Sequence, residues 1–270
     1  MHDHLDLERY PLDRPESPAW NALIARGRAS LAREGLFNLD QLVRPAAVRR
    51  ILSEIAEPMA TAAFHHARRH NVYFEPDPPG VPAGHPVRRE LTTANHTICG
   101  DQIPDSLLTR LYEWAPLRQL FAALLDKPAL YLMDDPLARI NVMTYADGQA
   151  LNWHFDRSEF TVTLLLQAAA SGGAFQYRRD LRTADDPNHD GVARVLNGED
   201  SAVQTLPLAP GTFNVFKGVN TLHRVTPVAG PQPRRIAVLS YYERPGVHFS
   251  VAERQGFYGR SESLTPAPGH

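Results

Sequence analysis

Residues 151–160, LNWHFDRSEF, place a histidine and an aspartate two positions apart in a segment with the composition of a β-strand. A strand has a side-chain period of two, so His154 and Asp156 are expected on the same side of a sheet. Both can ligate a metal. A third ligand from a later strand, His223 in TLHRVTPV, would complete a set of two histidines and one carboxylate. Such a set leaves positions open on a non-haem Fe(II) and suits oxygen chemistry.

The surroundings of the motif matter, because a His-x-Asp pair also arises by chance in a chain with 12 histidines. RINVMTYADGQALNWHFD reads as two strands joined by a turn at Asp147-Gly148, which is a hairpin signal. Further strand-like segments are FTVTLLLQ, the segment after the Pro210-Gly211 turn, and RRIAVLSYYE. Both candidate ligand clusters are therefore expected at strand ends or at junctions of strands and turns.

An ordered series of blocks resembles the Fe(II)/2-oxoglutarate-dependent oxygenases, in the branch that contains the BesD/HalD-type amino-acid halogenases and their hydroxylase relatives. The blocks run from about Asn141 to Gly246 and are WHFDRSEFTVTLLLQ, GGAFQY, LRTADDPNHDGVARVLNGED, LPLAPGTFNVFKG, LHRVTPV and PRRIAVLSYYERPG. RRELTTANHTICGDQIP and LYEWAPLRQL carry a weaker similarity. The resemblance implies Fe(II), the cosubstrate 2-oxoglutarate and O2. We expect a mainly β (α+β) fold, a double-stranded β-helix with a jelly-roll or cupin-like core and N-terminal supporting helices.

The resemblance makes His154, Asp156 and His223 the iron ligands. It also places an arginine on the strand after the distal histidine, where a planar guanidinium would pair with the distal carboxylate of 2-oxoglutarate. Alignment of the blocks favours Arg234 for this role, and strand alternation then turns Arg235 the other way. A register change of one residue would reverse the choice. The ordinary alternative is that both arginines form a solvated basic pair.

The reaction outcome depends on Asp156. The halogenases of this branch carry a small residue there, which leaves a coordination position for chloride, so the carboxylate of Asp156 implies hydroxylation of a C–H bond. Desaturation or epimerisation by the same enzyme class is an alternative outcome. A metal-binding jelly roll without turnover, a sensor or storage protein, is the alternative from another class. Asn141 and Tyr145, on one strand face before the motif, are candidate donors to 2-oxoglutarate, although ordinary sheet packing explains them equally well.

The expected substrate is a small molecule, a free amino acid or a derivative of one. A free amino acid needs a cation for its carboxylate and an acceptor for its ammonium. Arg88, Arg89 and His96 lie in a stretch interrupted by proline and glycine that suits a lid or pocket rim. Arg157 and Glu159 directly follow the motif, and Glu159 is a candidate acceptor for the ammonium. For all five residues a solvated surface position is the ordinary alternative.

The whole chain, 1–270, reads as one oxygenase domain. Helical support and a lid occupy about 17–125, and the jelly-roll core occupies about 130–246. Within the first part, the residues from about Ser17 to His70 are expected to be helical, with Pro45 in a first helical turn. His65, His66 and His70 close that pattern, where cations near a helix C-terminus are favoured, and a second metal site is the alternative.

A second helical patch is expected over residues 105–125, and a short helix is expected at DGVARVL within a polar insertion. The tail after Gly246, which ends in SESLTPAPGH, is expected to be disordered.

Composition excludes several classes of function. The net charge of −2 and the absence of a basic tract argue against a nucleic-acid partner and against an anionic membrane surface. No run reaches the roughly 18 apolar residues of a membrane helix, and MHDHLDLERYPLDRPES lacks the apolar core of a signal peptide. Cys99 is the single cysteine, so no intrachain disulfide can form. We therefore expect a cytoplasmic enzyme; its oligomeric state stays open, with a homodimer among the options.

Overall fold

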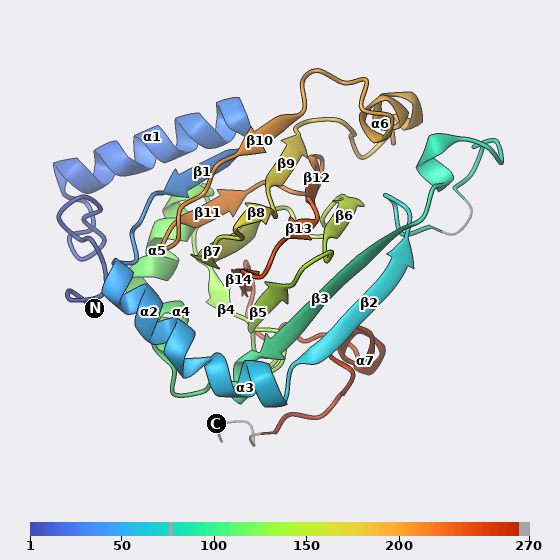
Figure 1. Ribbon diagram of the computed structural model, residues 1–270. Helices are drawn as coiled ribbons and strands as arrows, with labels where there is room; N and C mark the ends of the chain where they lie inside the picture. Colours follow the sequence, from blue (N-terminus) through green and yellow to red (C-terminus); the bar gives the residue numbers. More distant parts are fainter. Residues whose placement is uncertain (76–77, 265–270) are drawn as a thin grey trace.

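A computed structural model describes residues 1–75 and 78–264 of the chain (Figure 1). The larger of its sheets consists of β1 (Leu36–Leu39), β2 (Phe64–His70), β3 (Leu91–Cys99), β5 (Ile140–Tyr145), β7 (Thr161–Gln167), β11 (Phe213–Phe216) and β14 (Arg234–Leu239). The smaller sheet consists of β6 (Leu151–His154), β9 (Phe175–Arg178), β10 (Gln204–Leu206) and β12 (Leu222–Val225). Two short pairs join β4 (Tyr131–Leu132) to β15 (Tyr241–Tyr242) and β8 (Ser171–Gly172) to β13 (Val228–Ala229).

The two main sheets are antiparallel throughout. The seven-stranded sheet has the order β1-β11-β7-β14-β5-β3-β2, and the four-stranded sheet has the order β10-β9-β12-β6. Figure 1 shows how the strands of the two sheets are arranged. Residues of both sheets line one cavity. This arrangement confirms the expected double-stranded β-helix.

Most of the helices lie in the N-terminal half of the chain. They are α1 (Pro18–Glu34), α2 (Pro45–Glu54), α3 (Ala56–Thr61), α4 (Leu107–Glu113), α5 (Ala115–Leu124), α6 (His189–Leu196) and α7 (Val251–Tyr258), with single 3₁₀ turns at Pro86–Arg88 and Gly100–Gln102. The helices expected over residues 105–125 and at DGVARVL are confirmed as α4, α5 and α6. The expected first-turn proline is also confirmed, since α2 begins at Pro45.

Strand alternation gives the larger sheet two different faces. Apolar side chains on one face, among them Val142, Leu164 and Ala237, join the largest hydrophobic cluster together with residues of α1, α2, α4 and α5. The alternate residues on the same strands point to the opposite face and line the cavity between the sheets. The helices thus cover and support the outside of the sheet and leave its inner face to the cavity.

The expectation of helix from Ser17 to His70 is wrong in two places. Residues 36–39 form β1, which pairs with β11, and residues 64–70 form β2, which pairs with β3 over its whole length. His65, His66 and His70 therefore lie on an edge strand and not at a helix C-terminus. Their partner strand lies more than 20 residues away along the chain, and such long-range pairing overrides local preference.

The stretch with Arg88, Arg89 and His96 was expected to form a lid or pocket rim, but part of it is a strand. Residues 91–99 form β3, a strand inside the larger sheet, so His96 belongs to the wall of the fold.

The expectation that the tail after Gly246 is disordered is wrong, because this segment contains the helix α7. Ser250 and Glu253 form a capping box at the start of α7, in which each side chain accepts from the backbone N–H of the other residue. Residues 265–270 of SESLTPAPGH lie outside the described residues.

None of the helices in residues 1–75 and 78–264 has the length and apolar content that a membrane-spanning helix needs.

The segment that follows α7 is held by a buried carboxylate. Arg260 donates to both oxygens of Asp101 at 2.6 and 2.7 Å, and the backbone N–H of Leu264 donates to the same carboxylate at 2.8 Å. The side chain of Asp101 is 0% exposed, so these partners replace the water that it lost on folding.

Replacing Arg260 with Met should leave the Asp101 carboxylate buried without its cation. We expect the free energy of unfolding to fall by about 2–3 kcal/mol, somewhat less than for a fully isolated buried charge because Leu264 still donates. Chemical denaturation measures this change. Arg33→Met is the control, since Arg33 is 71% exposed and its ion pair among the described residues is with the adjacent Glu34; it should change stability by less than about 0.5 kcal/mol. Equal stability of the two variants would contradict the role of Arg260.

Candidate active site

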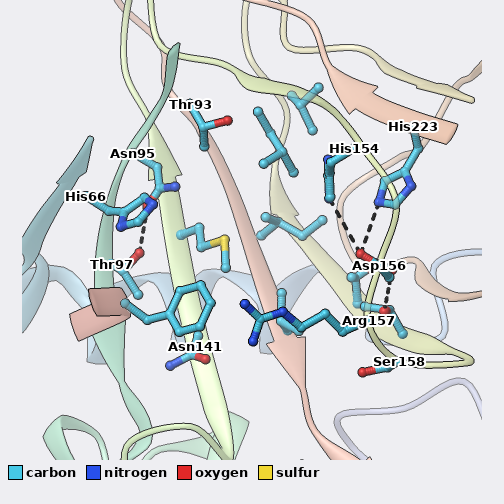
Figure 2. A pocket seen from close by; sticks show the side chains of 18 of the residues that line it. His66, Thr93, Asn95, Thr97, Asn141, His154, Asp156, Arg157, Ser158 and His223 are labelled. Atoms are coloured by element: carbon cyan, nitrogen blue, oxygen red, sulfur yellow. Dashed lines mark hydrogen bonds and ion pairs between the residues drawn. The ribbon is translucent and has the colours of Figure 1, made fainter. Parts of the chain in front are cut away.

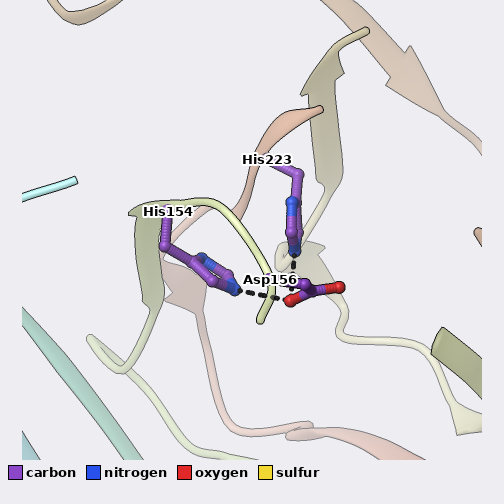
Figure 3. A group of neighbouring side chains, drawn as sticks. All are labelled: His154, Asp156 and His223. Atoms are coloured by element: carbon purple, nitrogen blue, oxygen red, sulfur yellow. Dashed lines mark ion pairs between the residues drawn. The ribbon is translucent and has the colours of Figure 1, made fainter. Parts of the chain in front are cut away.

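Three potential ligands converge where the smaller sheet faces the cavity. His154 is the last residue of β6, Asp156 follows two residues later, and His223 lies directly opposite His154 on the antiparallel strand β12. Oδ1 of Asp156 lies 3.5 Å from Nε2 of His154 and 3.3 Å from Nε2 of His223 (Figure 3). One ligand atom from each residue fits within 4.8 Å of the others. The structure thus brings together the three residues that the sequence predicted.

Backbone carbonyls orient both imidazoles. Nδ1 of His154 lies 2.8 Å from the carbonyl oxygen of Asn152, and Nδ1 of His223 lies 2.9 Å from that of Thr221. Each Nδ1 therefore donates a hydrogen bond to a carbonyl, and Nε2 is the ring nitrogen that faces Asp156 and is placed to bind a metal. Such a hydrogen bond on the far nitrogen is the usual support of a metal-binding histidine.

The protonation states also suit a metal. Burial, with His223 nearby, lowers the pKa of His154, so its imidazole is neutral near pH 7. Burial alone would raise the pKa of Asp156, but His223 and His154 outweigh that effect and hold the pKa well below its usual value. The neutral imidazole of His154 and the ionised carboxylate of Asp156 are in the form that binds a cation. The donor set fits Fe(II) with three positions left open.

The cavity beside these residues has a volume of about 360 Å³. Figure 2 shows the triad on one side and His66, Thr93, Asn95 and Thr97, from β2 and β3, on the opposite side. Aromatic side chains from the segment around α7, namely Phe249, Phe257 and Tyr258, complete another part of the lining. The volume falls within the range of small-molecule sites, and an apolar lining with a few polar groups is typical of them.

Arg234 is the one charged residue in the lining that is deeply buried without a counter-ion among the described residues. Its side chain is 4% exposed, and its Nε and Nη2 atoms have no hydrogen-bond partner in the part of the chain that the structure describes. Burial lowers the pKa of Arg234 to about 10, so the guanidinium stays charged near pH 7. A buried charge of this kind requires an anionic partner, and the planar guanidinium fits a carboxylate such as that of 2-oxoglutarate.

Comparisons with known proteins place this site in a family. Residues 20–254 match the profile of halogenase D. The chain belongs to the halogenase D family. The match confirms the resemblance seen in the sequence blocks, and with it the enzyme class, a 2-oxoglutarate-dependent non-haem iron oxygenase. A search of curated proteins finds no match.

Solved structures share the fold of this halogenase D family member. The α-ketoglutarate-dependent epimerase SnoN from nogalamycin biosynthesis is 16% identical over 82% of this chain and 81% of that chain, with a TM-score of 0.55. AviO1 from Streptomyces viridochromogenes Tue57 is 18% identical over 80% and 93%, with a TM-score of 0.54. A Pseudomonas putida prolyl-4-hydroxylase is 16% identical over 82% and 100%, with a TM-score of 0.51.

The other predicted cosubstrate residues occupy different environments. Tyr145 lies opposite Arg234 in the register of β5 and β14 and lines the cavity beside it. Burial raises the pKa of Tyr145 to about 12, so its phenol is a neutral donor. Asn141 also lines the cavity, but its amide donates to the carbonyl of Leu137 and accepts from the hydroxyl of Tyr258. Arg235 is outside the lining and lies opposite Thr144 and Gln167.

Of the five predicted substrate residues, the structure brings only Arg157 to the cavity, and its guanidinium pairs with Glu253 at 3.0 Å. The other four lie outside the lining. Arg88 donates to the carbonyl of Val81, Arg89 to that of Leu196, His96 stacks on His65, and Glu159 pairs with Lys127. Their positions argue against direct contact with a substrate in the cavity.

Sequence reasoning missed most of the wall opposite the triad. Thr93, Asn95 and Thr97 alternate along β3 and all line the cavity. Their period of two, in LTTANHTIC, is the signal that could have found them. The aromatic residues around α7 were missed because the tail was expected to be disordered; the spacing of Ser250 and Glu253 is the signal of a helix start there.

Removing one ligand should remove the metal site. We expect His223→Ala to weaken Fe(II) binding by more than about 100-fold, which exceeds the 10–100-fold effects typical of outer-shell partners. Anaerobic titration of the metal-free protein with Fe(II) measures the affinity. His65→Ala is the control, because His65 lies on the face of β2 outside the lining. Wild-type affinity in His223→Ala would show that the triad is not the iron site.

The two neighbouring arginines provide a matched test of cosubstrate binding. Arg234→Ala should raise the KM for 2-oxoglutarate roughly ten- to a hundred-fold, because a charge-assisted pair of about 1.5–3 kcal/mol is lost. Arg235→Ala should change this KM by much less, since its side chain lies outside the cavity lining. Steady-state assays of succinate formation at varied 2-oxoglutarate measure both. The opposite ranking of the two variants would assign the anchor to Arg235.

Proposed function

We propose that this protein is an Fe(II)/2-oxoglutarate-dependent dioxygenase that hydroxylates an unactivated C–H bond of a small molecule, a free amino acid or an amino-acid derivative. One atom of O2 enters the hydroxyl group of the product. The other enters succinate, which forms with CO2 when 2-oxoglutarate is decarboxylated. The observation that carries the proposal is the carboxylate of Asp156 between the Nε2 atoms of His154 and His223.

The residues of the chain have distinct roles in this proposal. His154, Asp156 and His223 hold Fe(II), which when bound supplies the activation of O2. Arg234 pairs with the distal carboxylate of 2-oxoglutarate, and the phenol of Tyr145 beside it is a neutral donor to the same group. The guanidinium then gains the anionic partner that its burial requires.

The aromatic lining contributes by excluding water. Phe249 and Phe257 reach the cavity from the segment around α7, and the hydroxyl of Tyr258 holds this segment to Asn141 at 3.0 Å. Exclusion of water strengthens electrostatic contacts in the site and limits side reactions of the oxidising species. The polar side chains of Thr93, Asn95 and Thr97, with Arg68 and His66 on the paired strand, remain to orient the substrate.

The family includes halogenases, so the choice of hydroxylation over chlorination needs a physical reason. The carboxylate of Asp156 occupies the coordination position that a small residue would leave to chloride. It also places a negative charge there, and its pKa lies well below the usual value, so the charge persists near neutral pH. Chloride would have to displace a partly buried carboxylate that both histidines face.

Two other kinds of function are alternatives to hydroxylation. A metal sensor or storage protein has no use for an anion site beside the metal. The buried guanidinium of Arg234, whose Nε and Nη2 have no partner among the described residues, argues against this class. Desaturation or epimerisation keeps the same residues, and SnoN, which shares the fold, is an epimerase. These outcomes differ in product mass: hydroxylation adds 16 mass units, desaturation removes two and epimerisation leaves the mass unchanged.

We also propose that the enzyme acts in the cytoplasm, where iron stays ferrous and 2-oxoglutarate is abundant.

The experiment begins with an anaerobic screen of free amino acids and their derivatives. A compound that binds near the metal should perturb the absorption band of the Fe(II)/2-oxoglutarate complex. Mass spectrometry of the aerobic product then identifies the reaction. With excess chloride present, the wild-type enzyme should add 16 mass units and incorporate no chlorine. A chlorinated compound as the main product would overturn the proposal.

Asp156→Gly tests the reason for this outcome by opening the coordination position. We expect most activity to be lost, with at best a minor chlorinated product, because groups that hold the anion and position the C–H bond matter as well. Asp156→Ala is the matched variant with a methyl group in place of the carboxylate. Full hydroxylase activity in either variant would show that Asp156 is not a ligand.

A further inference from the structure

The second oxygen of the Asp156 carboxylate has its own partners. Oδ1 faces the two histidines, whereas Oδ2 accepts a hydrogen bond from the hydroxyl of Thr161 at 2.8 Å. Thr161 is the first residue of β7 and lines the cavity. A hydroxyl donor to a carboxylate is a charge-assisted hydrogen bond, which is stronger than one between neutral groups. The two oxygens of one carboxylate are therefore held in different roles.

The backbone at Gly218 lies close to the same oxygen of the carboxylate. The N–H of Asp156 donates to the carbonyl of Gly218 at 3.1 Å. A Cβ at position 218 would lie 2.0 Å from Oδ2 and 2.5 Å from Cγ of Asp156, so no side chain fits there. Gly218 is not among the residues with a positive φ. The glycine is thus required by contact with the carboxylate and not by the backbone conformation.

From these contacts we infer that Thr161 and Gly218 are positioning residues that fix Asp156 as a one-oxygen ligand of the metal. The inference rests on the proposed iron site. The hydroxyl of Thr161 donates to Oδ2, and the missing side chain of Gly218 leaves the space in which the carboxylate is held. Only Oδ1 is then presented to the cation. A carboxylate free to rotate could bind through both oxygens and take up one of the positions that 2-oxoglutarate and O2 need.

Thr161→Val tests the hydrogen bond while it keeps the shape of the side chain. We expect Fe(II) affinity of the metal-free protein to fall about ten-fold, at the lower end of the effects of outer-shell partners. Thr161→Ser keeps the hydroxyl and should bind within about two-fold of wild type. Thr163→Val is the matched control, since Thr163 lies on the same face of the same strand and no hydrogen bond joins it to Asp156 among those in the described residues. Its metal affinity should equal that of wild type.

Cobalt(II) gives a readout that a merely structural role would not change. The visible absorption of the Co(II)-substituted protein depends on coordination number and geometry, so a carboxylate that turns in Thr161→Val should alter the band shape. Thr161→Ser and Thr163→Val should keep the wild-type spectrum. An unchanged affinity and spectrum in Thr161→Val would overturn the inference. Failure of the wild-type protein to bind Fe(II) would instead overturn the proposed function.

Gly218→Ala probes the other contact. The added methyl group must displace the Asp156 carboxylate, so we expect a larger loss of Fe(II) affinity than in Thr161→Val, together with a lower melting temperature. In the Asp156→Gly background the same substitution meets no side chain at position 156 and should leave the melting temperature unchanged. A double-mutant cycle compares the effect of Gly218→Ala in the two backgrounds. An equal effect of Gly218→Ala in both backgrounds would assign Gly218 to the backbone alone and overturn its positioning role.

Discussion

The antiparallel pairing of β6 with β12 is the constraint on which the site depends. It sets His223 directly opposite His154, with ring centroids 4.1 Å apart. Because opposite residues of an antiparallel pair point to the same face, both imidazoles reach the cavity, and the register of the pair shifts only beyond them, between His223 and Val225. Asp156 follows His154 after two residues and meets both Nε2 atoms. Ligands carried on paired strands are held more precisely than ligands on free loops would be.

In the larger sheet, too, strand alternation determines which residues line the cavity. Alternate residues of β5 and β14 divide between two environments, a helix-covered apolar face and a cavity face. Arg234 on the cavity face is costly to bury, and a slip of one residue would exchange it with Arg235. The register is held because Val142 and Ala237 pack under the helices. The stability of the outer core therefore maintains the position of a charged residue on the inner face.

Sequence reasoning succeeded where a strict period of two linked residues to one face. That period linked His154 to Asp156, whereas the resemblance to the oxygenase family supplied the role of His223 and ranked Arg234 above Arg235, in agreement with the cavity lining. It failed where the decisive contact lies far along the chain. β2 was expected to be helical from its local pattern, and this was wrong because its pairing with β3, a later segment of the chain, decides its structure. The aromatic wall was missed because α7 packs against strands that precede it by more than 100 residues.

The substrate residues failed for a different reason. Arg88, Arg89 and Glu159 are charged and close in sequence to plausible pocket segments, but charge and proximity do not fix the direction of a side chain. In the structure their charged groups meet backbone carbonyls or a lysine outside the cavity. The same limit applies to the reaction itself. A shared fold admits epimerases and hydroxylases alike. The outcome proposed for this protein therefore depends on the coordination position assigned to Asp156 and on Thr161 and Gly218, which contact its carboxylate.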